Sequence, residues 1–128
     1  MTMKKETGSL FDQSGKKISL SDLLNDIPKN NWSWFLFEFN GIGTAPDNLS
    51  MSEFEDLVLK NDNGYHFTWS QLQSFAHSLS DINDCLLAAI SHTDQISYSD
   101  IDRGDISKCN IIIKIFDSSF WEKIYGNL

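Results

Sequence analysis

The sequence is poor in the residue types that staple small secreted domains or carry metal chemistry. Its 128 residues include two cysteines, two prolines and three histidines. One disulfide is therefore the most that the chain can form, which excludes a dense disulfide framework. Cys85 and Cys109 both lie inside apolar runs, where a free thiol packs as a small hydrophobic side chain. We expect two buried thiols, with a disulfide between them as the less favoured alternative.

Long hydrophobic runs are also missing. The most apolar stretch, residues 32–39, is interrupted by Ser33 and Glu38, whereas a membrane-spanning helix needs roughly 20 apolar residues. The chain begins with charged residues, but the apolar run of a signal peptide does not follow them. We therefore expect a soluble, cytoplasmic protein without a membrane partner.

Motifs for metals, nucleotides and catalysis are scarce. His66, His77 and His92 occur singly, and no ligand pair has the spacing of a zinc site. Residues 100–105 (Asp-Ile-Asp-Arg-Gly-Asp) supply oxygen ligands as calcium loops do, but the other positions of an EF-hand loop do not match. Residues 41–43 (Gly-Ile-Gly) lack the rest of either nucleotide-binding signature. We expect no metal, no cofactor and no enzymatic activity; catalysis would require a cleft that brings a histidine near a carboxylate.

Negative charge is the most informative feature that the sequence does have. The net charge is −8, and eleven acidic residues between Asp47 and Asp105 face only two basic ones, Lys60 and Arg103. Binding to nucleic acid needs a basic face, so direct contact with DNA or RNA is excluded. An acidic field can instead steer a basic protein partner toward one face. The alternative is that the acidity serves solubility alone.

Periodicity and capping residues predict a mixture of helices and strands. We expect helices over 20–27, 51–58 and 69–79, and strands over 32–39, 65–67, 81–91 and 110–116. For 81–91 a helix is the alternative to a buried strand. Residues 91–108 are predicted to be a polar loop with a short strand at 96–98, and 120–125 are either helical turns or a turn into an edge strand.

The fold class follows from this order of elements. We predict an α/β or α+β fold with a small single sheet of about four to five strands, packed with three to four helices. The whole chain, 1–128, is expected to be one domain in which residues 1–9 are flexible. The four tryptophans lie on apolar faces and are assigned to the core: Trp32, Trp34, Trp69 and Trp121.

Two stretches resemble a known class of proteins. Residues 113–122 (Ile-Lys-Ile-Phe-Asp-Ser-Ser-Phe-Trp-Glu) are similar to the strand and Asp-Ser-Ser-aromatic-Trp turn of several small bacterial immunity proteins. Residues 57–69, a helix, an Asn-Gly turn and an aromatic strand, are compatible with the same class. The chain thus resembles the immunity proteins of bacterial toxin systems, including contact-dependent inhibition.

The resemblance implies a protein that binds its cognate toxin domain and occludes the active site or substrate groove, without turnover of its own. The toxin is expected to be a basic nuclease, because nucleases must hold nucleic acid. On this hypothesis acidic residues on the outer face of a helix and in the long loop contact the toxin, together with one aromatic anchor. The partner-binding residues are Glu53, Glu55, Asp56, Tyr98, Asp100, Asp102 and Asp105. The alternative is a non-catalytic acidic adaptor or structural assembly protein of phage or mobile-element origin, and the oligomeric state stays open.

Overall fold

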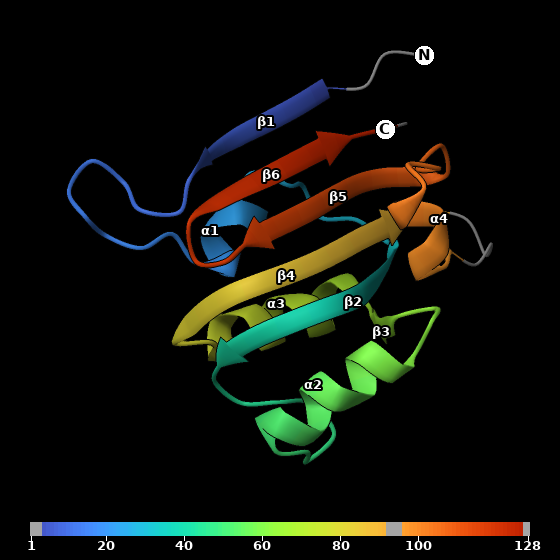
Figure 1. The fold of residues 1–128 in the computed structure, drawn as a ribbon, viewed down its shortest axis with the longest axis horizontal. Coiled ribbons are helices and arrows are strands. Elements are labelled where there is room, and N and C mark those ends of the chain that lie inside the picture. The colour runs from blue at the N-terminus through green and yellow to red at the C-terminus, as the bar shows by residue number, and fades with distance from the viewer. Residues whose placement is uncertain (1–3, 92–95, 127–128) are drawn as a thin grey trace.

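The computed structural model describes residues 4–91 and 96–126, which form one antiparallel sheet and four helices (Figure 1). The elements are β1 (Lys4–Ser9), α1 (Leu20–Leu24), β2 (Ser33–Ile42), α2 (Met51–Lys60), β3 (Tyr65–Phe67), α3 (Trp69–Ser78), β4 (Asp81–Ile90), α4 (Tyr98–Asp102), β5 (Cys109–Phe116) and β6 (Phe120–Tyr125). The predicted mixed fold is confirmed, but the sheet has six strands rather than four to five.

The sheet joins the two ends of the chain. Its strand order is β1-β6-β5-β4-β2-β3, and β1 pairs with β6 from Lys4 opposite Tyr125 to Ser9 opposite Phe120 (Figure 1). Residues 4–9, part of the segment 1–9 that the sequence predicts to be flexible, form β1 in the structure, while 1–3 lie outside the described residues. The helical alternative for residues 120–125 is wrong, and so is their placement at an edge, because β1 makes β6 an inner strand. This pairing has no local signal, since its partners are separated by more than a hundred residues in sequence.

Gly8 allows this close pairing. A Cβ atom at Gly8 would lie 2.8 Å from the indole ring of Trp121, so any side chain at this position would push the ring away. Trp121 is half-buried and packs against the larger core cluster from the end of the sheet.

Each of the four described helices begins after a Ser or Thr whose side chain accepts the backbone N–H of the residue three positions later. The backbone N–H of the same Ser or Thr donates to the side chain of that later residue, which completes a capping box. The pairs are Ser19 with Asp22, Ser50 with Glu53, Thr68 with Gln71, and Ser97 with Asp100. The predicted helix starts at residues 51 and 69 are confirmed. The last pair corrects the sequence prediction, because residues 96–98 lead into α4 rather than a strand. With five residues, α4 is too short to show helical periodicity.

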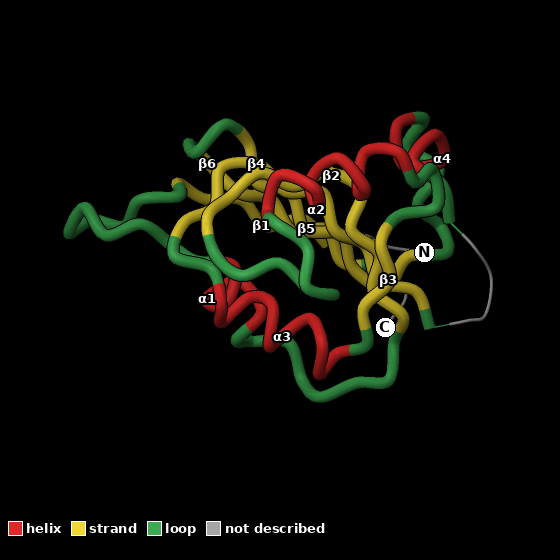
Figure 2. The backbone as a smooth tube through the Cα atoms, turned by 90° about the horizontal axis from the view of Figure 1, so that it is seen from below, coloured by secondary structure: helices red, strands yellow, loops and turns green. Residues whose placement is uncertain are grey.

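Both faces of the central strands are buried, but to different extents. The helices α1 and α3 lie on one side of the sheet (Figure 2). The large cluster includes Trp34, Leu87 and Ile113 of the sheet, and α1, α2 and α3 all contribute buried side chains to it. On the other face α4 covers a smaller cluster, in which Ile101 packs with Ala88 and other sheet residues. Because α4 is short, it covers only part of its face.

The predicted core residues fall into two groups. Trp34 and Trp69 are buried, as expected, whereas Trp32 and Trp121 are half-buried and pack against the margin of the core. Cys85 and Cys109 are buried free thiols in the two different clusters. The disulfide alternative is therefore wrong.

Within the part of the chain that the structure describes, no helix has the length and apolar character needed to cross a membrane.

An ion pair with one buried partner joins β6 to the segment that follows α1. The Lys123 side chain is 4% exposed, and its Nζ lies 2.6 Å from Oδ1 of Asp26, whose side chain is 62% exposed. Removing one partner of such a pair leaves a buried charge without compensation, which costs more than the intact pair contributes.

We expect Asp26→Ala to lower the free energy of unfolding by about 1–3 kcal/mol, because it leaves the Lys123 ammonium buried and unpaired. Lys123→Met, which removes the charge but keeps the volume, should change it by less than about 1 kcal/mol. Urea denaturation of the two variants and of the double variant tests this. The double variant should match Lys123→Met; if Asp26→Ala is as stable as the wild type, the pair contributes nothing.

Candidate protein-binding surface

The uncovered part of the second sheet face forms a groove beside α4. Its volume is about 310 Å³. The side chains that carry its chemistry are Glu38, Asp84, Tyr98, Asp102, Lys114 and Phe116. Among the described residues, three carboxylates and one amine line it, so the groove is negatively charged.

Strand alternation places these side chains on one face. Glu38 pairs with Leu86, which pairs in turn with Lys114 on β5, and partners across a sheet point to the same side. A register shift between Leu36 and Glu38 marks a bulge in β2, after which Glu38 faces the groove. The sheet thus brings a carboxylate from β2 and an amine from β5 to the same floor.

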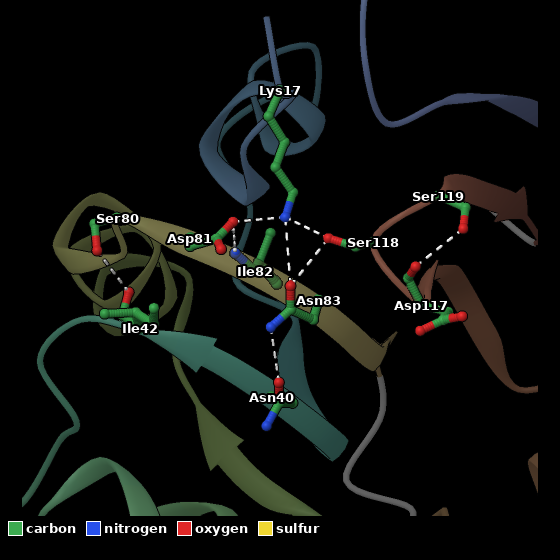
Figure 3. A network of polar contacts seen from close by, with 10 residues as sticks. All are labelled: Lys17, Asn40, Ile42, Ser80, Asp81, Ile82, Asn83, Asp117, Ser118 and Ser119. Atoms are coloured by element: carbon green, nitrogen blue, oxygen red, sulfur yellow. Dashed lines mark hydrogen bonds and ion pairs between the residues drawn. The ribbon is translucent and has the colours of Figure 1, made fainter.

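Asp84 is held in place from the turn between β5 and β6. Its Oδ1 accepts the backbone N–H of Asp117 at 2.9 Å. Beside it, the Lys17 amine lies within hydrogen-bonding distance of Asp81 Oδ1 at 2.6 Å and Ser118 Oγ at 2.5 Å (Figure 3). Hydrogen bonding to Lys17 holds the pKa of Asp81 below its usual value. This network ties the loop before α1 to the strand ends that border the groove.

Tyr98 fixes the wall of the groove. Its hydroxyl donates a hydrogen bond to the Glu38 carboxylate at 2.9 Å, and its backbone N–H donates to the carbonyl of Asp62 at 2.8 Å. The hydrogen bond to Glu38, followed by the charges of Glu38 and Asp102, raises the pKa of Tyr98. The hydroxyl therefore stays protonated at neutral pH and remains a donor.

An exposed aromatic pair lies next to the carboxylates. The rings of Phe116 and Phe120 stack with centroids 4.7 Å apart, and Phe120 is 47% exposed. A lysine or arginine side chain has an apolar stem and a charged head, and it can use both a ring and a carboxylate. The groove thus presents the two kinds of contact that a basic side chain of a partner would make.

The groove offers little for covalent chemistry. Cys85 lies beneath it, and burial, with the charges of Glu38 and Asp84, raises the pKa of its thiol, so the thiol is protonated at neutral pH. His66 and His77 are exposed and do not line the groove, while the predicted His92 lies outside the described residues. Over residues 4–91 and 96–126, no group of three or more His, Cys, Asp or Glu side chains is placed to hold a metal ion.

The predicted partner-binding residues near α4 divide into two kinds. Tyr98 and Asp102 line the groove. Asp100 instead caps α4 through Ser97 and pairs with Arg103 at 2.7 Å, and the hydrogen bonds from Ser97 lower its pKa. Asp105 is exposed in the following loop and does not line the groove.

The predicted residues on α2 also differ in their roles. Glu53 is committed to the capping box with Ser50, whose hydrogen bonds lower the pKa of the Glu53 carboxyl. Glu55 accepts the backbone N–H of Gly41 at 3.1 Å and lies 3.4 Å from the Asn40 amide, so it caps the outer edge of β2. Asp56 is exposed.

Glu55 nevertheless lies at the margin of the groove face. Asn40, which it contacts, pairs with the groove residue Asp84 across the sheet. The structure therefore brings α2 and α4 to two borders of the same face. The strand β2 continues to Ile42, beyond the turn that the sequence predicts after residue 39, because residues 40–42 pair with β4.

Sequence reasoning missed Glu38, Asp84 and the aromatic pair. Asp84 and Leu86 are two residues apart on a strand that the sequence does predict, so their side chains are expected on the same face of the sheet. This spacing could have identified Asp84 as a residue of that face. Glu38 was hidden by the bulge, because simple alternation does not place it correctly.

Comparisons of the chain with protein-family models, curated proteins and solved structures found no match. The functional interpretation therefore rests on the geometry and charge of the groove.

Two neighbouring acidic residues on α2, Glu55 and Asp56, allow a test of whether a carboxylate stabilises the fold. We expect Glu55→Ala to lower the free energy of unfolding by about 1–2 kcal/mol, because the Gly41 N–H loses a charged acceptor. Asp56→Ala, at the next position of the same helix, should change it by less than about 0.5 kcal/mol. Urea denaturation compares the two; equal effects would contradict the edge-capping role.

Proposed function

We propose that this protein is an immunity protein that binds and neutralises a bacterial toxin domain. The groove is the observation that carries the proposal: three carboxylates and an exposed aromatic pair converge on one face of the sheet. The segment that resembles immunity proteins, residues 113–122, forms the second half of β5, the turn and the start of β6, and it contributes Lys114, Phe116 and Phe120 to this face. Resemblance and geometry thus point to the same surface.

The groove would bind a basic, nucleic-acid-binding surface of the toxin, which we propose to be a nuclease. Such a surface is rich in lysine and arginine, so the acidic face would raise the association rate and block access of nucleic acid. The Phe116–Phe120 pair and Tyr98 would supply apolar contact at the centre. The protein would act in the cytoplasm by occlusion alone, without turnover or cofactor.

Growth rescue tests the function directly. The chain is co-expressed with a toxin-like domain encoded beside it, and bacterial survival is followed together with co-purification of the two proteins. Rescue with a stable complex supports the proposal. Continued killing despite soluble expression of this chain, with no complex, would contradict it for that toxin.

Matched charge variants test the surface. Asp102→Asn and Gln73→Lys both raise the net charge by one, but Gln73 lies on α3, on the opposite side of the sheet from the groove. We expect Asp102→Asn to lower the association rate constant about 2- to 10-fold at low salt, and less at high salt, because the groove loses local charge. Gln73→Lys should leave the rate within about twofold of the wild type. Surface plasmon resonance at several salt concentrations measures both, and equal effects would show that only net charge matters.

The outer edge of β1 favours a second candidate function, that of an adaptor or structural assembly protein. β1 is the terminal strand of the sheet and pairs with β6 on one side, and an open edge can pair with a strand of another copy. Light scattering on the purified chain decides between the candidates. A defined oligomer that does not bind the toxin domain would favour assembly, whereas a monomer that binds it would favour immunity.

A further inference from the structure

A second pocket lies on the α3 side of the sheet. It has a volume of about 530 Å³ and is bounded by β3, α3 and the loop 44–47. Pockets that hold small ligands commonly measure about 300–1,000 Å³, so this one is large enough. Its lining shares no residue with the acidic groove.

The wall formed by loop 44–47 is held at both ends. Ser78 Oγ on α3 lies 3.0 Å from the carbonyl of Thr44 and 2.6 Å from that of Phe75, so its one hydroxyl hydrogen is shared between the loop and α3. The Tyr65 hydroxyl donates to the Asp47 carboxylate, which fixes the loop to β3. Asp47 and Asn48 have φ angles of 58° and 60°, a left-handed conformation that these residue types tolerate better than most. The wall is therefore shaped before a ligand arrives, which lowers the entropy cost of binding.

The charge of the pocket favours a neutral ligand. Within the described residues, no lysine or arginine lines it, so an anion would find no permanently charged cation there. Among the same described residues Asp47 supplies the one carboxylate of the lining, and it already accepts the Tyr65 hydroxyl. A cation would gain more from the groove on the other face, where three carboxylates converge.

The polar groups of the pocket are mostly hydroxyls. Ser70 and Ser74 lie four residues apart on α3, so they line one wall in a row. Ser70 and Ser74 are exposed, and His66 on β3 adds an exposed imidazole. Below them, Phe67 and Phe75 stack with centroids 5.3 Å apart and close the bottom of the pocket.

We propose that this pocket binds a neutral, polyhydroxylated small molecule of monosaccharide size. A sugar ring presents a face of C–H groups, which suits the apolar bottom, and an edge of hydroxyls, which suits the serines, the imidazole and the second oxygen of Asp47. The site is independent of the acidic groove and of the proposed immunity function.

Titration followed by NMR tests the pocket. Methyl β-glucoside, methyl α-mannoside and N-acetylglucosamine are each added to about 50 mM, a concentration that detects millimolar binding. At least one should shift the amide resonances of residues 44, 45, 47 and 65–78 in a saturable manner; Pro46 has no amide proton to follow. Phosphate and arginine serve as charged probes and should not. No localised shift with any neutral probe, or stronger binding of a charged one, would overturn the proposal.

Two tryptophan variants on α3 provide the matched control. Ser74 lines the pocket and Gln73 does not, and both are exposed. Ser74→Trp should fill the pocket and weaken sugar binding at least tenfold, whereas Gln73→Trp should bind as the wild type does. Thermal unfolding checks that both variants fold. Equal affinities of the two folded variants would contradict this location, and Asp102→Asn should leave sugar binding unchanged.

Discussion

Burial of β4 and β5 on both faces is the constraint on which the rest of the structure depends. Their residues alternate between the two core clusters, so each face of the sheet needs its own cover. On one face α1, α2 and α3 contribute to this cover, and on the other the five-residue helix α4 covers only a short patch. The groove exists because this second cover ends before the sheet does. Its polar floor is tolerated because Glu38, Asp84 and Lys114 lie where the sheet meets solvent.

Acidic residues have two different roles in this fold: some form local hydrogen bonds that cap helices and strands, and others line the groove. Some are committed locally: Glu53 and Asp100 cap helices, and Glu55 caps the free edge of β2. Others, such as Glu38 and Asp102, converge on the groove and keep oxygens available to a partner. Counting acids along the sequence therefore overstates the charge that is free for binding. The spatial grouping of the second kind is what supports a basic partner.

The acidic groove and the pocket beside α3 differ in the chemistry that they offer to a ligand. The acidic groove sits on the face that α4 covers partly, and its contacts are charge and exposed rings. The other pocket lies beside α3, and its contacts are hydroxyls over an apolar bottom. Because the sheet stands between them, a change in one need not alter the other, and the two proposals can stand or fall separately.

Local sequence signals were enough to predict helices over 51–58 and 69–79, strands over 65–67 and 110–116, and the negative charge of the central segment. These features depend on neighbours close in the chain: a capping residue and its partner three positions on, or a β-branched run. Three features depend on tertiary structure: the pairing of residues 4–9 with β6, the inner position of the strand 120–125, and the presence of Glu38 and Asp84 in a groove beside α4. Such contacts arise from pairing between distant segments and from a bulge in β2, and neither has a local signature. The sequence therefore predicted two of the residues that line the groove, Tyr98 and Asp102. The other two acidic residues, Glu38 and Asp84, were identified only once the pairing of the strands was known.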